Sequence, residues 1–412
     1  MVAPVRTFFL PAVICGVFWG WAGANLSPAA EGDQGSPSAP DRMNYFLCTQ
    51  AIGGPYRFTD QPYLLEVARR IAAMGSNFIK FTTSFEGKPY GMKKIEGIET
   101  LVDLFEKHPV YREVMTLPFT YYHLWVYPAW ETKWEDGVDA GEEKKLYAEF
   151  RAFAEYLLKK YDGTGKQFYL GHWEGDWTMS GATDPKVDAT PERIRGFTQY
   201  LQIRQRAIED ARREVPHRDV AVYHYVEVNQ VLKGLDGKRP TVTNAVLAEV
   251  NPDFVSYSCY EAIYWGDPRE KIPLAFSEVE SRLKPRPEIS GKRVFAGEFA
   301  VKASAVDFDG KAHARKNLEV ARILLEWGCP FAVYWQFYCN EPNEKKSEGY
   351  EGFWLVDSKN RETQLYSDFV RYFREMRDWS NRQKEVGKKI GHEEVKAEAI
   401  QLIQKLQVNE SN

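Results

Sequence analysis

Short apolar runs alternate with longer amphipathic segments along most of the chain, from Met43 to Trp379. Short apolar runs predict buried strands, whereas apolar residues spaced three and four apart predict helices. The predicted strands cover residues 45–50, 78–83, 119–126, 167–174, 220–226, 254–260, 293–299 and 331–337. The predicted helices cover residues 61–74, 99–115, 143–161, 191–214, 241–249, 269–284, 312–328 and 363–379. Eight strands that alternate with eight helices predict an α/β fold, a (β/α)8 or TIM barrel, rather than a doubly wound sheet or a sandwich.

The first 24 residues have the order of a secretory signal peptide. Arg6 precedes an apolar stretch over 7–21, and Ala22-Gly-Ala24 is a cleavage site of small residues. We expect cleavage after Ala24, a secreted or periplasmic protein, and no stable membrane span after cleavage. The alternative is an uncleaved anchor, although the apolar run is shorter than the ~20 residues of a span. Residues 25–40 are rich in Pro, Gly and Ser, which predicts a flexible linker.

The barrel is predicted to cover residues 41–380, followed by a charged helical extension over 381–412. Apolar residues at helical spacing within 393–406 predict an extra helix that packs on the outside of the barrel. The alternative is a helix that binds a partner. The formal charge of -4, from 54 basic and 58 acidic residues, gives no footprint for nucleic acid. The cysteines that follow the signal include no CxxC pair, so we expect buried free thiols at Cys48, Cys259, Cys329 and Cys339.

Glu174 is a candidate catalytic acid at the end of the fourth predicted strand. It lies between Trp173 and Trp177, where an unpaired carboxylate is costly to bury. Burial against aromatic rings raises the pKa of a carboxyl group, as a general acid requires. Side chains alternate along a strand, so we expect His172, Glu174 and Asp176 to share the face that points into the barrel mouth.

Glu298 is the second candidate carboxylate, on the seventh predicted strand. We expect it to share an inward face with Val294 and Ala296, with Gly297 allowing close approach of neighbouring groups. A barrel gathers its strand ends into one site, so Glu298 can face Glu174 there. Glycoside hydrolysis needs such a pair of carboxyl groups. The alternative for Glu298 is a structural salt bridge with Lys80.

Aromatic and histidine side chains also gather at predicted strand ends. Flat aromatic faces suit the apolar faces of sugar rings, and eight tryptophans lie at or just beyond these ends: Trp125, Trp130, Trp134, Trp173, Trp177, Trp265, Trp335 and Trp354. His123, His172 and His224 lie on the third, fourth and fifth predicted strands. They could contact substrate or, together with Glu174 or Asp176, form a metal site.

Several short motifs together resemble glycoside hydrolase clan A, the retaining (β/α)8 β-glycosidases. They are Gly75-x-Asn77-x-Ile79-Lys80, Glu174, Tyr260, Gly297-Glu298-Phe299, Tyr334-Trp335-Gln336 and Gly352-Phe-Trp-Leu-Val-Asp357-x-Lys-x-Arg361-x-Thr363. The resemblance spans residues 43–379.

The resemblance implies a role for each matching residue. Glu174 would be the acid/base and Glu298 the nucleophile. Tyr260 would hydrogen-bond the nucleophile, and Trp335 would form the floor of the sugar subsite. Two positions depart from the family, which usually has Asn where Trp173 stands and Arg where Lys80 stands.

The sequence therefore predicts an exported glycoside hydrolase that cleaves a β-linked oligo- or polysaccharide with retention and needs no cofactor or catalytic metal. The alternatives are a carbohydrate-binding pseudoenzyme and a metal-dependent barrel hydrolase. The candidate substrate-binding residues are Lys80, His123, Trp125, His172, Trp173, Asp176, Trp177, His224, Tyr260 and Trp335.

Overall fold

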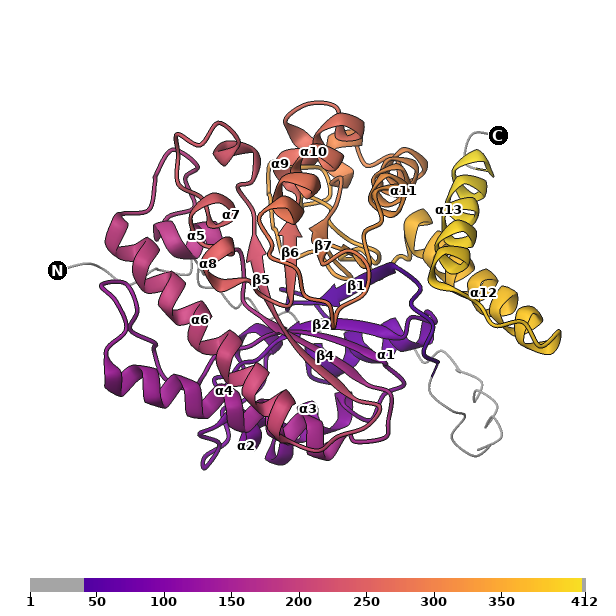
Figure 1. Ribbon diagram of the computed structural model, residues 1–412. Coiled ribbons are helices and arrows are strands. Elements are labelled where there is room, and N and C mark those ends of the chain that lie inside the picture. The colour runs from indigo at the N-terminus through magenta and orange to yellow at the C-terminus, as the bar shows by residue number, and fades with distance from the viewer. Residues whose placement is uncertain (1–40, 410–412) are drawn as a thin grey trace, which may run out of the picture. The chain divides into compact units, whose positions relative to one another are not determined.

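The computed structural model describes residues 41–409, within which eight parallel strands form a closed barrel (Figure 1). Consecutive strands pair with each other, and β8 pairs with β1 to close the barrel. The strands are β1 (Leu47–Ala51), β2 (Phe78–Thr82), β3 (Tyr121–Trp125), β4 (Gln167–Gly171), β5 (Ala221–Val228), β6 (Phe254–Ser258), β7 (Val294–Phe299) and β8 (Ala332–Tyr334). The predicted (β/α)8 barrel is confirmed. The predicted signal peptide (1–24) and linker (25–40) lie outside the described residues.

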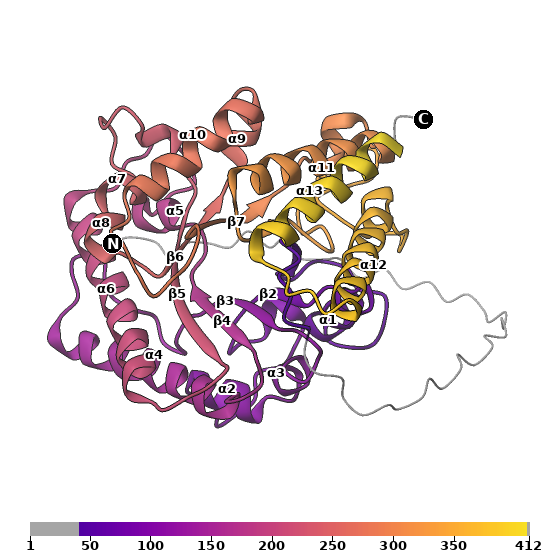
Figure 2. The ribbon, with the colours of Figure 1, turned by 45° about the vertical axis from the view of Figure 1, so that its right-hand side comes forward.

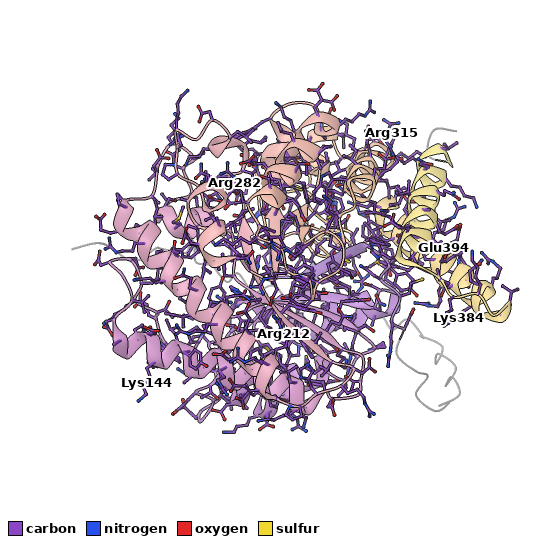
Figure 3. All side chains as sticks on the ribbon, viewed as in Figure 1. Lys144, Arg212, Arg282, Arg315, Lys384 and Glu394 are labelled. Carbon is purple, nitrogen blue, oxygen red and sulfur yellow. The ribbon has the colours of Figure 1, made fainter. Side chains whose placement is uncertain are left out.

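Helices follow the strands and surround the barrel (Figure 2). They are α1 (Tyr63–Ala73), α2 (Leu101–Lys107), α3 (Pro109–Val114), α4 (Ala140–Lys160), α5 (Gly175–Ser180), α6 (Pro191–Glu214), α7 (Val242–Ala245), α8 (Leu247–Val250), α9 (Tyr260–Tyr264), α10 (Pro268–Ser281), α11 (Gly310–Trp327), α12 (Gln364–Glu385) and α13 (His392–Asn409). Within the described part of the chain, three short 3-10 turns, η1 (Lys88–Tyr90), η2 (Leu232–Gly234) and η3 (Ala303–Val306), lie in the connections. Charged side chains such as Lys144, Arg315 and Lys384 are exposed on the outward faces of the helices (Figure 3).

Several element boundaries differ from the prediction. The single helix predicted over 99–115 is two helices, because a residue before proline avoids helical backbone and His108 precedes Pro109. β4 ends at Gly171 and β6 at Ser258, each earlier than predicted. β5 instead continues to Val228, beyond its predicted end. These shifts change which residues belong to strands at the barrel mouth.

The C-terminal segment adds a helix to the outside of the barrel, as predicted. α12 continues through Glu385, past the predicted boundary at 380. In Figure 2, α13 lies beside α11 and α12, which it contacts. Its apolar face is buried through Val395, Ala399, Leu402, Ile403 and Leu406. Burial of this face provides the tertiary packing from which most of the stability of a protein helix comes.

The inside of the barrel contains an aromatic layer below a polar layer. Phe78, Tyr169, Phe295 and Phe331 surround His123 with ring centroids 4.4 to 4.8 Å from its own. Lys80 lies two positions after Phe78 and Trp125 two positions after His123, so both point inward in the layer above. Glu227 of β5 lies in the same layer. The polar layer therefore lies nearer the C-terminal ends of the strands, where barrel active sites are found.

Candidate active site

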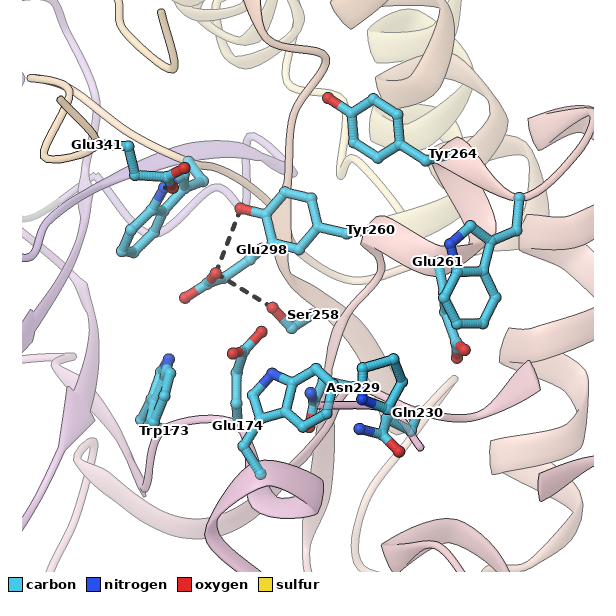
Figure 4. A pocket seen from close by; sticks show the side chains of 14 residues that line it. Trp173, Glu174, Asn229, Gln230, Ser258, Tyr260, Glu261, Tyr264, Glu298 and Glu341 are labelled. Carbon is cyan, nitrogen blue, oxygen red and sulfur yellow. Dashed lines mark hydrogen bonds between the residues drawn. The ribbon is translucent and has the colours of Figure 1, made fainter. Parts of the chain in front are cut away.

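A cavity of about 410 Å³ opens at the C-terminal ends of the strands and contains both candidate carboxylates (Figure 4). Its lining combines aromatic rings with carboxyl and carboxamide groups, the combination expected of a sugar site. The lining residues are Trp173, Glu174, Trp177, Pro185, Asn229, Gln230, Ser258, Tyr260, Glu261, Tyr264, Trp265, Glu298, Trp335 and Glu341.

Glu298 reaches this cavity because the pairing of β7 is irregular. Phe295 packs in the aromatic layer, so strict alternation turns Gly297 inward and Glu298 outward. The register of β7 shifts against β6 and against β8 around Glu298. Such an irregularity re-aims a side chain, and here it directs Glu298 into the barrel mouth. The predicted inward face shared by Val294, Ala296 and Glu298 is therefore wrong, although Glu298 does line the pocket.

Gly297 allows the close packing that was predicted at this position. A Cβ atom there would lie 1.7 Å from Ser256 Oγ and 3.1 Å from Glu227 Oε2. A larger residue would displace both side chains.

Three hydrogen-bond donors surround the Glu298 carboxylate. The Ser258 hydroxyl donates to Oε2 at 3.1 Å and the Tyr260 hydroxyl donates to the same oxygen at 3.3 Å (Figure 4). Lys80 Nζ donates to Oε1 at 3.4 Å. The expected bond from Tyr260 is present, and so is the salt bridge with Lys80 that formed the alternative. Together these donors favour the ionised form of Glu298.

Glu174 lies in the turn that connects β4 to α5, three residues beyond the end of the strand. His172, Glu174 and Asp176 therefore do not share a strand face, and that prediction is wrong. Glu174 is 9% exposed, and its carboxyl group points toward Ser258 and Glu298 (Figure 4). Its backbone N–H donates to Glu227 Oε1 at 2.9 Å, which fixes the turn.

Glu227 is a third carboxylate of the site, which the sequence reasoning missed. It is fully buried on β5 and accepts hydrogen bonds from Ser256 Oγ at 2.7 Å, Lys80 Nζ at 3.4 Å and Trp125 Nε1 at 3.4 Å. Lys80 thus bridges Glu227 and Glu298 and also lies 4.3 Å from the centre of the Trp125 ring. Lys80 and Trp125 lie beneath the cavity rather than among its lining residues.

Burial raises the pKa of both candidate catalytic carboxyl groups, but not equally. For Glu174, burial and the neighbouring charges of Glu298 and Glu227 raise the pKa well above its usual value. Burial raises the pKa of Glu298 to about 8, and Lys80 opposes this rise. The Lys80 ammonium bound to Glu298 therefore favours ionisation of Glu298 over ionisation of Glu174. Such a difference suits one group to act as a nucleophile and the other as an acid.

Asp176 supports the site from behind the cavity. Its Oδ2 accepts from the backbone N–H groups of Asn229 at 2.8 Å and Gln230 at 3.0 Å. Its Oδ1 accepts from the N–H of Val242 at 2.7 Å. Both carboxylate oxygens of Asp176 therefore bind backbone N–H groups and hold the loop after β5 in place. Asp176 was predicted to contact substrate, but it does not line the cavity.

The three candidate histidines also lie outside the cavity. His123 is enclosed in the aromatic layer, where burial lowers its pKa well below the usual value. His172 packs against Phe197 of α6, and His224 pairs with Gln205 of the same helix at 2.9 Å. Alternation along a strand predicts whether a side chain points inward, but not how deep it lies.

Four of the eight candidate tryptophans line the cavity: Trp173, Trp177, Trp265 and Trp335. The indole of Trp335 donates to Glu341 Oε1 at 3.1 Å, which fixes the orientation of its ring. Other tryptophans serve in packing. Trp134 packs against Phe197, for example, and Trp354 packs against Phe308.

Comparison with known proteins supports the fold and leaves the family unassigned. No protein-family model matches the chain, and no curated protein matches its sequence. An exo-β-1,4-mannosidase from Opitutaceae bacterium strain TAV5 has a similar structure, with a TM-score of 0.50 at 17% identity over 80% of this chain. A GH5_18 protein from Bifidobacterium longum subsp. infantis gives a TM-score of 0.51 at 13% identity, covering 80% of this chain and 78% of its own.

This chain spans 59% of the length of the mannosidase. The structural similarity is to glycoside hydrolases of clan A on a (β/α)8 barrel, in agreement with the resemblance seen in the motifs. At these identities the likeness establishes the shared barrel fold.

The described residues also bear on the expectations for a metal site, for the cysteines and for a membrane span. Within residues 41–409, no three His, Cys, Asp or Glu side chains are grouped so that they could hold a metal ion. Cys48, Cys259, Cys329 and Cys339 are free and buried, as expected. In the same part of the chain, no helix has the length and apolar character to cross a membrane.

Proposed function

We propose that this chain is an exported glycoside hydrolase that cleaves a β-linked saccharide with retention of configuration. The observation that carries the proposal is that two carboxyl groups face each other in one aromatic-lined cavity and have different surroundings. Glu298 receives three donors, including the Lys80 ammonium, whereas burial and the neighbouring negative charges raise the pKa of Glu174 and so favour its protonated form. The proposed export rests on the order of residues in 1–24.

The reaction would proceed in two steps. In the first, the Glu298 carboxylate attacks the anomeric carbon while Glu174 gives its proton to the departing glycosidic oxygen. This step forms a bond between Glu298 and the sugar and breaks the glycosidic bond. In the second step, Glu174 takes a proton from water, and the water oxygen replaces Glu298 at the anomeric carbon. Glu174 and Glu298 then return to their starting protonation states.

Turnover of simple glycosides tests this proposal. We expect the purified protein to release nitrophenol from at least one 4-nitrophenyl β-glycoside in a panel of gluco-, galacto-, manno- and xylosides. The product sugar should first appear as the β-anomer, which NMR detects before mutarotation. Release of the α-anomer would contradict retention.

The alternative of a carbohydrate-binding pseudoenzyme is favoured by Trp173, which lines the cavity where the family usually has Asn. It predicts that oligosaccharides bind, by calorimetry, without turnover on any member of the panel. The same assay therefore separates the two functions.

Replacement of Glu227 tests how the third carboxylate contributes. The negative charge of Glu227 raises the pKa of both Glu174 and Glu298. In Glu227→Gln we expect both limbs of the pH profile of kcat/KM to move to lower pH, because Glu298 must be ionised and Glu174 protonated. We also expect kcat/KM at the optimum to fall by about 100-fold, since an NH2 group replaces the oxygen that accepts from Ser256, Lys80 and Trp125 and disturbs the groups beneath the cavity.

A purely structural role for Glu227 predicts a lower melting temperature with unmoved pH limbs. Glu270→Gln, on the exposed face of α10, is the matched control and should leave the profile unchanged.

A further inference from the structure

The loop that follows β5 presents two carboxamide groups to the half of the cavity beside Glu174. Asn229 and Gln230 both line the cavity, although their residues are only 7% and 2% exposed. In Figure 4, Gln230 lies on the Glu174 side of the cavity and Glu341 on the opposite side of Glu298. Asn229 and Gln230 therefore occupy the end of the cavity away from Trp335, which is hydrogen-bonded to Glu341.

Asp176 fixes this loop in place. Its carboxylate accepts both backbone N–H groups of Asn229 and Gln230, and its own N–H donates to Asn229 Oδ1 at 3.0 Å. The oxygen of the Asn229 carboxamide is thereby occupied, and its NH2 group is left for another partner. A loop held by this many bonds presents its side chains in a defined geometry.

The nitrogen of the Gln230 carboxamide is left without a hydrogen-bond partner among the described residues. This atom, Nε2, is buried. Buried polar groups are almost always paired, so an unpaired donor in a cavity wall indicates a ligand or a bound water. A carboxamide offers two N–H donors and an acceptor, which suits the hydroxyl groups of a sugar.

The charged groups around the cavity also limit which sugars it could bind. Its described lining residues include four carboxyl groups, on Glu174, Glu261, Glu298 and Glu341, and no Lys, Arg or His. Glu261 is 5% exposed, and burial raises its pKa to about 7. The nearby cation Lys80 lies beneath the cavity, already bound to Glu227 and Glu298. The described lining therefore offers an anionic sugar no cationic partner, and each carboxyl group that is ionised would repel it.

We propose that Asn229 and Gln230 form the subsite for the leaving-group sugar, and that this subsite accepts an uncharged sugar and rejects a uronic acid. The proposal rests on the function proposed above, because the leaving group lies beside the residue that protonates it. The hydroxyl groups of that sugar would satisfy the Gln230 and Asn229 carboxamides, and the carboxylates of the cavity would repel an anion.

Paired substrates test the subsite. The probes are β-1,4-linked disaccharides of glucose, mannose and galactose, each compared with the 4-nitrophenyl glycoside of the same sugar. A nitrophenyl group carries no hydroxyl groups, so it does not use the subsite. In Gln230→Ala and Asn229→Ala we expect kcat/KM for the cleaved disaccharide to fall by about 10-fold or more, with less than about a threefold change for the nitrophenyl glycoside.

Glu341→Gln is the matched control at the other end of the cavity. The sugar bound at that end is common to both substrates, so any change in kcat/KM should be equal for the two. An equal loss on both substrates in Gln230→Ala and Asn229→Ala would overturn the subsite assignment.

The charge preference needs a separate comparison. A disaccharide with glucuronic acid as the leaving sugar should be cleaved by the parent protein at least about 10-fold more slowly than its neutral counterpart at pH 8, where Glu261 is mostly ionised. Equal rates would contradict the charge preference.

Calorimetry separates failure of the subsite from failure of the proposed function. If the parent protein cleaves none of the probes, binding of the three disaccharides is measured instead. Binding that weakens about 10-fold or more in Gln230→Ala would support the subsite on a protein without turnover. Undetectable binding to the parent, or equal binding to parent and variant, would overturn it.

Discussion

Replacing Glu298 with Gln is expected to lower kcat by at least about 1,000-fold on every glycoside that the parent protein cleaves. The substitution removes the attacking oxygen while keeping the size of the side chain, and no second carboxylate can take its place. Burial and neighbouring charges raise the pKa of Glu174 and so favour its protonated form, and Glu227 is fully buried beneath the cavity and paired with Lys80. Steady-state kinetics over the nitrophenyl panel measure the loss.

The folded state of the Glu298→Gln variant must be checked, because Lys80 loses one of its two carboxylate partners. Circular dichroism and a melting curve serve this purpose. Glu270→Gln, which neutralises an exposed carboxylate on α10, should retain full activity. If the folded Glu298→Gln variant kept more than about a tenth of the parent activity, Glu298 would not be the nucleophile.

Replacing Glu174 with Ala should give a different pattern, which depends on the leaving group. Poor leaving groups need the proton, so we expect kcat on a disaccharide to fall by about 1,000-fold. A 2,4-dinitrophenyl glycoside departs without protonation, so its first step survives and the glycosyl–Glu298 intermediate accumulates. Added azide should then restore turnover, because azide attacks the intermediate without a general base.

The product of this rescue is itself diagnostic. Azide that attacks the intermediate yields a β-glycosyl azide, which NMR distinguishes from the free sugar. An absence of rescue, together with equal losses on both kinds of substrate, would show that Glu174 is not the acid/base.

The repeating strand–helix pattern was enough to predict the barrel. Because a closed barrel gathers the C-terminal ends of its strands at one face, Glu174 and Glu298 lie in one cavity although they are far apart in the sequence. The irregular pairing of β7 could not be predicted from the residue pattern. Glu298 therefore lines the cavity for a different reason from the expected one, since strict alternation would have turned it outward.

Glu227 was missed because the fifth strand was predicted to end at Val226, two residues before its end at Val228. The alternation of Tyr223, Tyr225 and Glu227 along a longer strand is the signal that could have found it. The error for His123 concerns its depth in the barrel and not the length of its strand. Its inward direction was evident, but nothing in the sequence distinguished the aromatic layer from the polar layer above it. Depth along a barrel depends on the register of neighbouring strands, which a single strand does not encode.

In the proposed reaction, Glu298 forms a covalent bond with the sugar. The most direct measurement uses the 2,4-dinitrophenyl 2-deoxy-2-fluoro analogue of the glycoside that the protein cleaves best, followed by mass spectrometry of the intact protein and its peptides. We predict that the protein gains the mass of one fluorosugar, carried by the peptide that contains Glu298, and that Glu298→Gln gains none. A label on another residue, or full turnover of the parent substrate with no covalent adduct, would contradict this prediction.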